Sequence, residues 1–189
     1  ASLGWAPDRL PIQEQATIVV GNAIRLDWAN VVSPSDDLVI AGNPPFVGQY
    51  TKTDEQAADV KFAWGTGYDG YLDYVTSWHA KALAYLRGTS ALWAFVTTNS
   101  ITQGQAVPAL FRPIFNDGWK IKFAHTTFPW TSDASGKAAV HCVIIGFTND
   151  SATKPTLYVY DGASGQPREQ TPNNINAYLL DGGNVFVDK

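Results

Sequence analysis

The tetrapeptide Asn43-Pro44-Pro45-Phe46 combines residue types that can hold and activate a planar amino group. The Asn43 side-chain oxygen is one hydrogen-bond acceptor, and the Pro44 carbonyl is a second. Two consecutive prolines hold this backbone extended, because their rings fix φ and their nitrogens donate no hydrogen bond. An amino group on an aromatic ring is a poor nucleophile, since its lone pair is delocalised. Two fixed acceptors favour the positive charge that develops as this nitrogen attacks a methyl donor, without a metal or a covalent nucleophile.

Phe46 adds a flat face on which a base can stack, which contributes about 1–3 kcal/mol. A base in duplex DNA has to leave the helix to reach such a site, which costs free energy. Stacking on both faces offsets that cost, so a second aromatic ring is expected, and Phe128 in Phe128-Pro129-Trp130 is the best candidate. Two simpler interpretations compete: Asn-Pro-Pro alone usually marks a turn, and an aromatic residue such as Phe128 usually packs in a core.

The elements that must position these residues follow from apolar runs and helical spacing. Short β-branched or apolar runs predict strands at Thr17–Gly21, Asp37–Ala41, Ala91–Thr97, Trp119–Thr127, Ala139–Phe147 and Leu157–Tyr160. Helices are expected near Asp54–Val60 and over Tyr71–Leu86, Val107–Phe115 and Asn173–Leu180. This order predicts an α/β doubly wound fold, with a mixed sheet and an antiparallel edge hairpin. The loop at 43–46 follows a strand directly, where ligands bind in such sheets.

Composition places the chain among folded domains. It has 189 residues, 45% hydrophobic and 16% charged, enough for one core. No apolar run approaches the roughly 20 residues that span a bilayer, and no secretory signal is visible, so a cytoplasmic protein without membrane contact is expected. The single cysteine, Cys142, excludes an internal disulfide and a cysteine-rich zinc site. The net charge of −4 argues mildly against DNA contact by this segment alone.

Several motifs, taken in order, make the sequence resemble the amino-methyltransferases, and more narrowly the methyltransferase region of fused type II restriction-modification enzymes related to MmeI. The resemblance covers nearly the whole chain. Its motifs are GNAIRLDW (21–28), AGNPPFVGQY (41–50), LDYVTSWHAKAL (72–83), FVTTNSITQG (95–104), FAHTTFPW (123–130), GKAAVHCVIIGF (136–147) and NNINAYLLDG (173–182). It implies the C-terminal part of a Rossmann-like class I fold that uses S-adenosylmethionine (SAM), and methyl transfer to N6 of a flipped adenine in double-stranded DNA.

The resemblance also implies roles for individual residues. Asn43, Pro44, Pro45 and Phe46 match the catalytic motif, and Phe128 matches the ring that packs against the flipped base.

Two further residues fall on the donor side of the expected site. Asn22 matches the position that contacts the adenine of the methyl donor, where many relatives carry Asp. Tyr74 is expected near the donor pocket, with core packing as an equal alternative. Asp27 is a less suitable candidate for the same contact with the methyl donor, and its simpler interpretation is a solvated loop carboxylate.

Other polar residues are expected to play lesser parts. A loop after the strand at 91–97 is expected to shape the pocket through Asn99, Ser100 and Gln103. Lys137 is interpreted as a solvated lysine rather than a phosphate ligand. His125 and His141 lie on predicted strands, where core histidines are commoner than catalysts.

One departure from the family pattern concerns the donor site. Relatives bind SAM with an FxGxG turn after the first strand, and no such turn precedes Asn22. Residues 1–160 are therefore interpreted as a catalytic-domain fragment, and residues 161–189 as a linker and the start of a following region. The absence of any methionine agrees with a fragment. The isolated chain is then expected to bind SAM weakly and to be inactive.

The chemistry of the loop leaves alternatives open. Cytosine N4 is close to adenine N6, and the aromatic residue after Pro-Pro does not decide between them. Asn-Pro-Pro-Tyr loops also serve protein glutamine N5 methylation, although the motifs FAHTTFPW and NNINAYLLDG favour DNA. An isolated non-catalytic binding piece is the third possibility.

Overall fold

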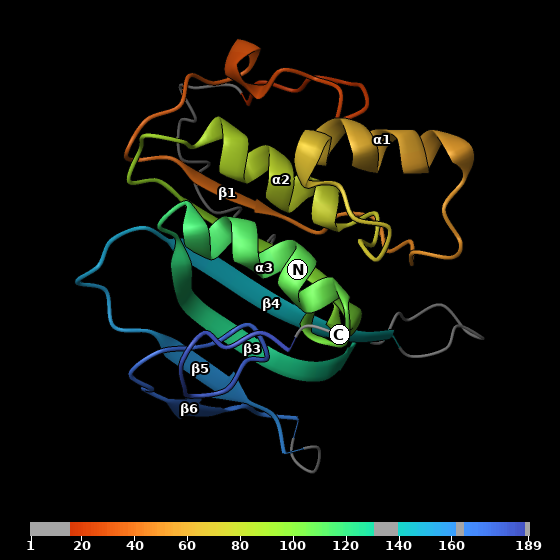
Figure 1. Cartoon of the computed structure of the whole chain (residues 1–189). Helices are drawn as coiled ribbons and strands as arrows, with labels where there is room; N and C mark the ends of the chain where they lie inside the picture. The colour runs from red at the N-terminus through yellow and green to blue at the C-terminus, as the bar shows by residue number, and fades with distance from the viewer. Residues whose placement is uncertain (1–15, 131–139, 162–164, 188–189) are drawn as a thin grey trace, which may run out of the picture.

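Six strands form one mixed sheet in the computed structural model, which describes residues 16–130, 140–161 and 165–187 (Figure 1). The strands are β1 (Val39–Gly42), β2 (Leu92–Thr98), β3 (Lys120–Trp130), β4 (Val140–Thr148), β5 (Thr156–Val159) and β6 (Arg168–Gln170). Their order across the sheet is β1-β2-β4-β3-β5-β6. The pairs β1–β2 and β3–β5 are parallel, and the other three neighbouring pairs are antiparallel.

Three α-helices accompany this sheet. They are α1 (Asp54–Trp64), α2 (Thr76–Tyr85) and α3 (Ala106–Asn116), with 3-10 turns η1 (Trp28–Asn30), η2 (Gly65–Gly67) and η3 (Asn99–Thr102). Helix α1 begins at a capping box, in which the Thr53 hydroxyl accepts from Gln56 N and the Gln56 side chain accepts from Thr53 N. No helix among the described residues is long and apolar enough to cross a membrane.

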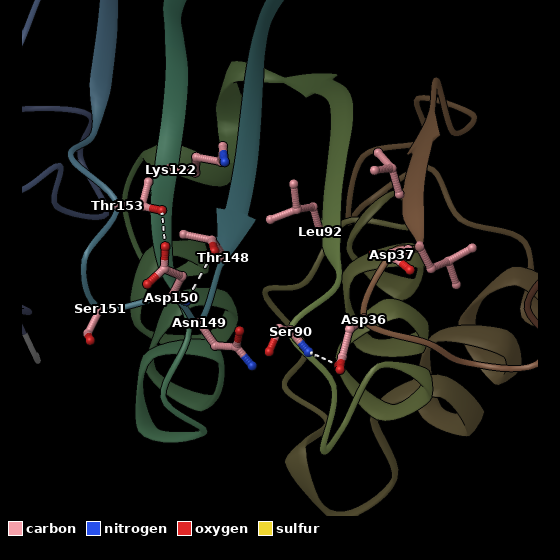
Figure 2. A pocket seen from close by; sticks show the side chains of 12 residues that line it. Asp36, Asp37, Ser90, Leu92, Lys122, Thr148, Asn149, Asp150, Ser151 and Thr153 are labelled. Atoms are coloured by element: carbon pink, nitrogen blue, oxygen red, sulfur yellow. Dashed lines mark hydrogen bonds between the residues drawn. The ribbon is translucent and has the colours of Figure 1, made fainter.

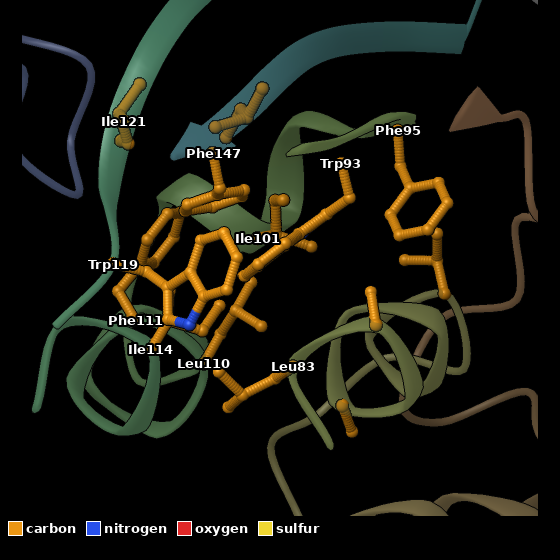
Figure 3. Close-up of a cluster of buried hydrophobic side chains, with 14 of the residues drawn as sticks. Leu83, Trp93, Phe95, Ile101, Leu110, Phe111, Ile114, Trp119, Ile121 and Phe147 are labelled. Carbon is orange, nitrogen blue, oxygen red and sulfur yellow. The ribbon is translucent and has the colours of Figure 1, made fainter. Parts of the chain in front are cut away.

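The core lies between the helices and one face of the sheet (Figure 3). Alternate residues of β2 are buried and turn toward α2 and α3. The Trp93 ring stacks on Phe147 of β4 at 4.9 Å and meets Trp119 at 4.3 Å. The ring of His79, from α2, meets Phe95 at 5.1 Å between centroids. This packing fixes β2 and α2, the two elements that flank the loop at 43–46.

On the opposite face of the sheet, β3 and β4 approach each other closely. The Phe123 ring lies where a Cβ on Gly146 would be, since an added Cβ would stand only 2.1 Å from it. The described residues place no helix on this face (Figure 1).

Most of the predicted elements are confirmed. The strands expected after 37, 91, 119, 139 and 157 correspond to β1 to β5, and the three internal helices are present. The antiparallel hairpin is β3–β4, but it is not at the edge, because β5 and β6 continue the sheet beyond it. The α/β class and the mixed sheet are therefore correct.

Two predicted elements are wrong. Residues 17–21 pair with no described strand, and Ile18 and Val20 are 83% and 93% exposed, because β propensity gives a strand only where a partner is present. Residues 173–180 form turns instead of a helix. There the Asn176 side chain accepts from the backbone N–H groups of Tyr178 and Leu180, an alternative to helical hydrogen bonds.

The region interpreted as a linker and the start of a following region, residues 161–189, contributes a strand. Arg168–Gln170 forms β6 on the outer edge of β5. Beyond it, Ile175, Ala177 and Leu179 are buried in the same core as the helices. The described residues after β5 thus extend the sheet and contribute to the core.

Candidate functional site

The loop at 43–46 begins where β1 ends. Because β1 and β2 are parallel, with Gly42 opposite Phe95, the loop after β1 and turn η3 after β2 leave the same edge of the sheet. Ligands of open α/β sheets bind at this edge, outside the carboxyl ends of the strands. The topology therefore brings the predicted catalytic tetrapeptide beside the predicted loop at 99–103.

The four residues of the tetrapeptide differ in exposure. Pro44 is buried and Phe46 half-buried, which anchors the turn, whereas Asn43 and Pro45 are exposed. Within the described part of the chain, the Asn43 amide has no hydrogen-bond partner. Its oxygen is consequently available to a ligand.

The tetrapeptide separates two pockets. A pocket of about 320 Å³ lies on the side of Asn43, Pro44 and Pro45 and is walled by Trp28 and Trp78.

The second pocket, of about 810 Å³, lies on the side of Phe46. Thr98, the last residue of β2, and Ser100, in the turn that follows, line it. The other lining side chains include aromatic rings and amides: Phe46, Tyr50, Tyr71, Gln49, Gln103 and Gln105. A planar ring with polar edges fits such a lining. Ser100 and Gln103 lie where the sequence predicted, in the pocket wall, while Asn99 is not part of that wall.

A buried carboxylate, Asp73, ties the loop to the end of β2, and the sequence analysis did not identify it. Asp73 is 7% exposed and accepts from Gln49 N at 2.7 Å and from Ser100 Oγ at 2.5 Å. The next residue, Tyr74, donates its backbone N–H to Val47 O at 3.0 Å. The only sequence signal was its place beside Tyr74 in the motif LDYVTSWHAKAL.

Lys52 closes the same loop from its other end. Its ammonium donates to Leu72 O at 2.6 Å. Burial lowers the pKa of Lys52, although the charge of Asp73 acts in the opposite direction. The segment 47–52 is thus attached to residues 72–74 at several points.

The two predicted donor-side residues, Asn22 and Tyr74, meet on one carboxylate. Asp59 of α1 is 2% exposed and accepts from Asn22 Nδ2 at 2.8 Å, from Arg25 Nε at 2.6 Å and from Tyr74 Oη at 3.1 Å. Burial acts to raise the pKa of Asp59, but these hydrogen bonds and the Arg25 charge outweigh it, so the pKa lies below its usual value. Burial, with the Asp59 contact, raises the pKa of Tyr74 to about 12.

Asn22 keeps part of its hydrogen-bonding capacity. Its Oδ1 also accepts from Ile24 N at 3.0 Å. An amide has two donor hydrogens and two acceptor lone pairs, so one of each remains on this exposed side chain.

Phe128 lies on the sheet face opposite the helices. It pairs with Cys142 of β4, which in turn pairs with Thr98 of β2. Val140 of β4 lines the larger pocket, and its partner on β3 is Trp130, so Phe128 lies on the strand next to the pocket lining, two residues from Trp130. Its half-buried ring contacts Tyr160 at 5.1 Å, and it is not among the residues that line the pocket with Phe46.

The other polar candidates are distributed over the domain. His125 is half-buried, stacked on Tyr158 at 4.4 Å and hydrogen-bonded to Tyr160 Oη at 2.9 Å, and burial lowers its pKa. His141 is exposed on β4, so its expected place in the core is wrong. Asp27 caps η1 through Ala29 N. Lys137 lies outside the described residues.

A further pocket of about 680 Å³ occupies the opposite end of the sheet (Figure 2). It lies where β1 and β2 begin and β4 ends, and its polar groups include Asp36, Asp150 and Thr148. Asp36 and Asp150 accept hydrogen bonds from nearby backbone N–H groups. Across the described residues, no group of three or more His, Cys, Asp or Glu side chains is placed to hold a metal.

Comparison with known proteins shows the family to which the chain belongs. Residues 2–159 match the family model described as MmeI, DNA-methyltransferase domain. DNA methyltransferase A of Bacillus subtilis (strain 168) is 35% identical over 181 residues, which cover 94% of this chain and 20% of that protein. The structure of the type IIL restriction-modification enzyme MmeI in complex with DNA superimposes with a TM-score of 0.86 at 42% identity, over 94% of this chain and 24% of the other. The chain thus spans about a quarter or less of these relatives, and it belongs to the MmeI DNA-methyltransferase domain family.

Proposed function

We propose that this chain supplies the catalytic loop of a SAM-dependent DNA methyltransferase that methylates N6 of adenine, in a restriction-modification or phage-defence system. The observation that carries the proposal is the position of Asn43. Its unpartnered amide follows the carboxyl end of β1 and lines the smaller pocket, three residues before Phe46, which lines the larger one. Family membership supports methyl transfer to DNA, the chemistry of the loop supports an exocyclic amino group as the acceptor, and the choice of adenine N6 over cytosine N4 follows the resemblance of the motifs.

In this proposal the target adenine occupies the larger pocket. Its ring stacks against Phe46, and its amino group extends toward the smaller pocket, where Asn43 Oδ1 and the Pro44 carbonyl accept its hydrogens. Both N–H bonds are then directed at fixed acceptors, which reduces the delocalisation of the nitrogen lone pair into the ring and makes it available for attack. The acceptors also favour the cationic nitrogen that forms on methylation, before it loses a proton to solvent.

The methyl donor belongs on the other side of the loop. SAM, when bound, supplies an electrophilic methyl group. Asn22 fits the adenine edge of SAM, because its amide retains one donor and one acceptor, the pair with which Asn reads adenine. Tyr74 holds Asn22 indirectly through Asp59.

Double-stranded DNA is the proposed partner of the full-length protein. A duplex adenine reaches the larger pocket only after flipping out of the helix. The wide, open lining around Tyr50 and Tyr71, which are 89% and 44% exposed, can accept an extruded base. Phe128, on the strand next to Val140 of the pocket lining, is proposed to pack against the outer face of the extruded base.

The test is methyl transfer by the full-length protein. Radiolabelled SAM is offered with duplex DNA, and the modified nucleoside is identified by mass spectrometry. We expect N6-methyladenine from the unaltered protein and a loss of roughly 100-fold or more in Asn43→Ala. N4-methylcytosine would correct the base, and labelling of a glutamine-containing protein acceptor instead of DNA would replace the function. Asn30→Ala, another exposed asparagine, is the matched control and should retain activity.

A further inference from the structure

We propose that Asp73 is a positioning residue of the methyl-transfer site, which holds the segment carrying Phe46 against the end of β2. The proposal rests on the function proposed above, and it adds a residue whose side chain acts on the loop rather than on the substrate. The two carboxylate oxygens of Asp73 accept hydrogen bonds from two different segments of the chain.

Each oxygen of Asp73 has its own donor. Oδ1 accepts the backbone N–H of Gln49 at 2.7 Å, and Oδ2 accepts the hydroxyl of Ser100 at 2.5 Å. The Ser100 hydroxyl also lies 2.8 Å from Thr98 Oγ1, the last residue of β2. A single carboxylate therefore links the loop after β1 to the turn after β2, 24 and 27 residues away in sequence.

The segment that Asp73 holds has little structure of its own. Residues 43–53 lie in no helix or strand, and Gly48 and Thr51 form only one turn, with a hydrogen bond of 3.1 Å. Two residues that closely follow Phe46 are held by hydrogen bonds. The Tyr74 N–H donates to Val47 O, and the Gln49 N–H donates to the Asp73 carboxylate. The position of the Phe46 ring then depends on these contacts.

Asp73 also lies in the right place to affect the substrate site. It lines the larger pocket together with Phe46 and Ser100. Both of its oxygens already accept hydrogen bonds from two different segments, so it is suited to set the geometry of the loop. A hydrogen bond to a charged acceptor changes an equilibrium by roughly 10- to 100-fold, which is the scale expected for misplacement of the ring.

The experiment uses the full-length protein with Asp73→Ala, Ser100→Ala and a control, Asp69→Ala. Asp69 lies in the same connection and also accepts a backbone N–H, from Tyr71 at 2.9 Å, but it does not bind the segment at 47–52. Three quantities are measured: kcat and KM for each substrate, the fluorescence of 2-aminopurine at the target position, and hydrogen exchange of the peptide spanning 46–52.

A positioning role predicts a specific pattern. In Asp73→Ala, kcat falls roughly 10- to 100-fold while KM for SAM changes by less than about threefold. The 2-aminopurine signal decreases, and exchange at 46–52 becomes faster. Ser100→Ala removes one contact and should show the same pattern at roughly tenfold. Asp69→Ala should resemble the unaltered protein in all three.

Several results would overturn the proposal. Unchanged kcat in both Asp73→Ala and Ser100→Ala would do so, as would a loss in Asp69→Ala equal to that in Asp73→Ala. If Asp73→Ala does not fold, Ser100→Ala decides, and normal kcat in it contradicts the proposal. If the unaltered protein methylates no DNA, the function proposed above fails separately, and unchanged exchange at 46–52 then refutes the role of Asp73.

Discussion

Asn22 and Tyr74 donate to the same carboxylate oxygen, Asp59 Oδ2, at 2.8 and 3.1 Å. The two residues come from segments far apart in sequence, and Asp59 lies on a third segment, helix α1. Tyr74 also holds the catalytic loop through its backbone N–H to Val47 O. The residue proposed to contact the donor and the loop proposed to act on the acceptor therefore share one structural support.

Replacing Asp59 should affect stability and the donor side together. In Asp59→Ala, three donors lose a buried acceptor, so we expect the free energy of unfolding to fall by roughly 2–3 kcal/mol in urea denaturation. KM for SAM should rise more than KM for DNA, because Asn22 loses its support. Asp54→Ala, an exposed carboxylate on the same helix, should cost about 0.5 kcal/mol. Equal increases in both KM values would contradict a donor-side role for this cluster.

The buried histidine of α2 predicts a pH dependence of stability. His79 is fully buried, and its Nδ1 accepts from Trp93 Nε1 at 3.3 Å, while Nε2 has no partner among the described residues. Burial lowers the pKa of His79 from 6.5 to about 3. Below pH 6.5 the unfolded chain therefore binds a proton at His79 that the folded chain does not bind. The contribution of neutral His79 to stability is fully present above that pH and is lost as the pH falls toward 3.

Between pH 7 and pH 5 this histidine should cost about 2 kcal/mol of stability. His79→Gln, whose amide oxygen can still accept from Trp93, should make urea denaturation less dependent on pH in this interval. His141→Gln, at an exposed position, is the matched control and should leave the pH profile unchanged. A slope that is equally steep in His79→Gln would assign the pH dependence to other groups.

The local parts of the fold were predictable, and the long-range contacts were not. The apolar run Ala91–Thr97 forms strand β2 as predicted, and Asn43 follows a strand as expected. Asp73 and Asp59 were missed because their partners are distant in sequence. Gln49 lies 24 residues from Asp73 and Asn22 lies 37 residues from Asp59, and no local periodicity of the sequence indicates such a contact. Local signals also failed where side chains competed with the backbone, as Asn176 does in the expected C-terminal helix.

Phe128 should matter more for activity than for stability. Its ring is half-buried and contacts Tyr160 on the face away from the helices, so Phe128→Ala is expected to cost about 1–2 kcal/mol in urea denaturation. Loss of stacking on the flipped base should lower kcat/KM for DNA by roughly tenfold or more. Phe62→Ala, a 53% exposed phenylalanine on α1, is the control. A protein that unfolds in Phe128→Ala would favour a purely structural role for this ring.

The isolated 189-residue chain should bind SAM weakly. Asn22 offers one donor and one acceptor to the donor's adenine, and no FxGxG turn precedes Asn22 in this sequence to hold the remainder of the molecule. One bidentate contact supplies only about 1–3 kcal/mol of discrimination, far less than the roughly 8 kcal/mol of a micromolar complex. Calorimetry with SAM should show no saturable heat at micromolar concentrations for this chain and clear binding for the full-length protein. Tight binding by the isolated chain would mean that residues 1–189 already contain the whole donor site.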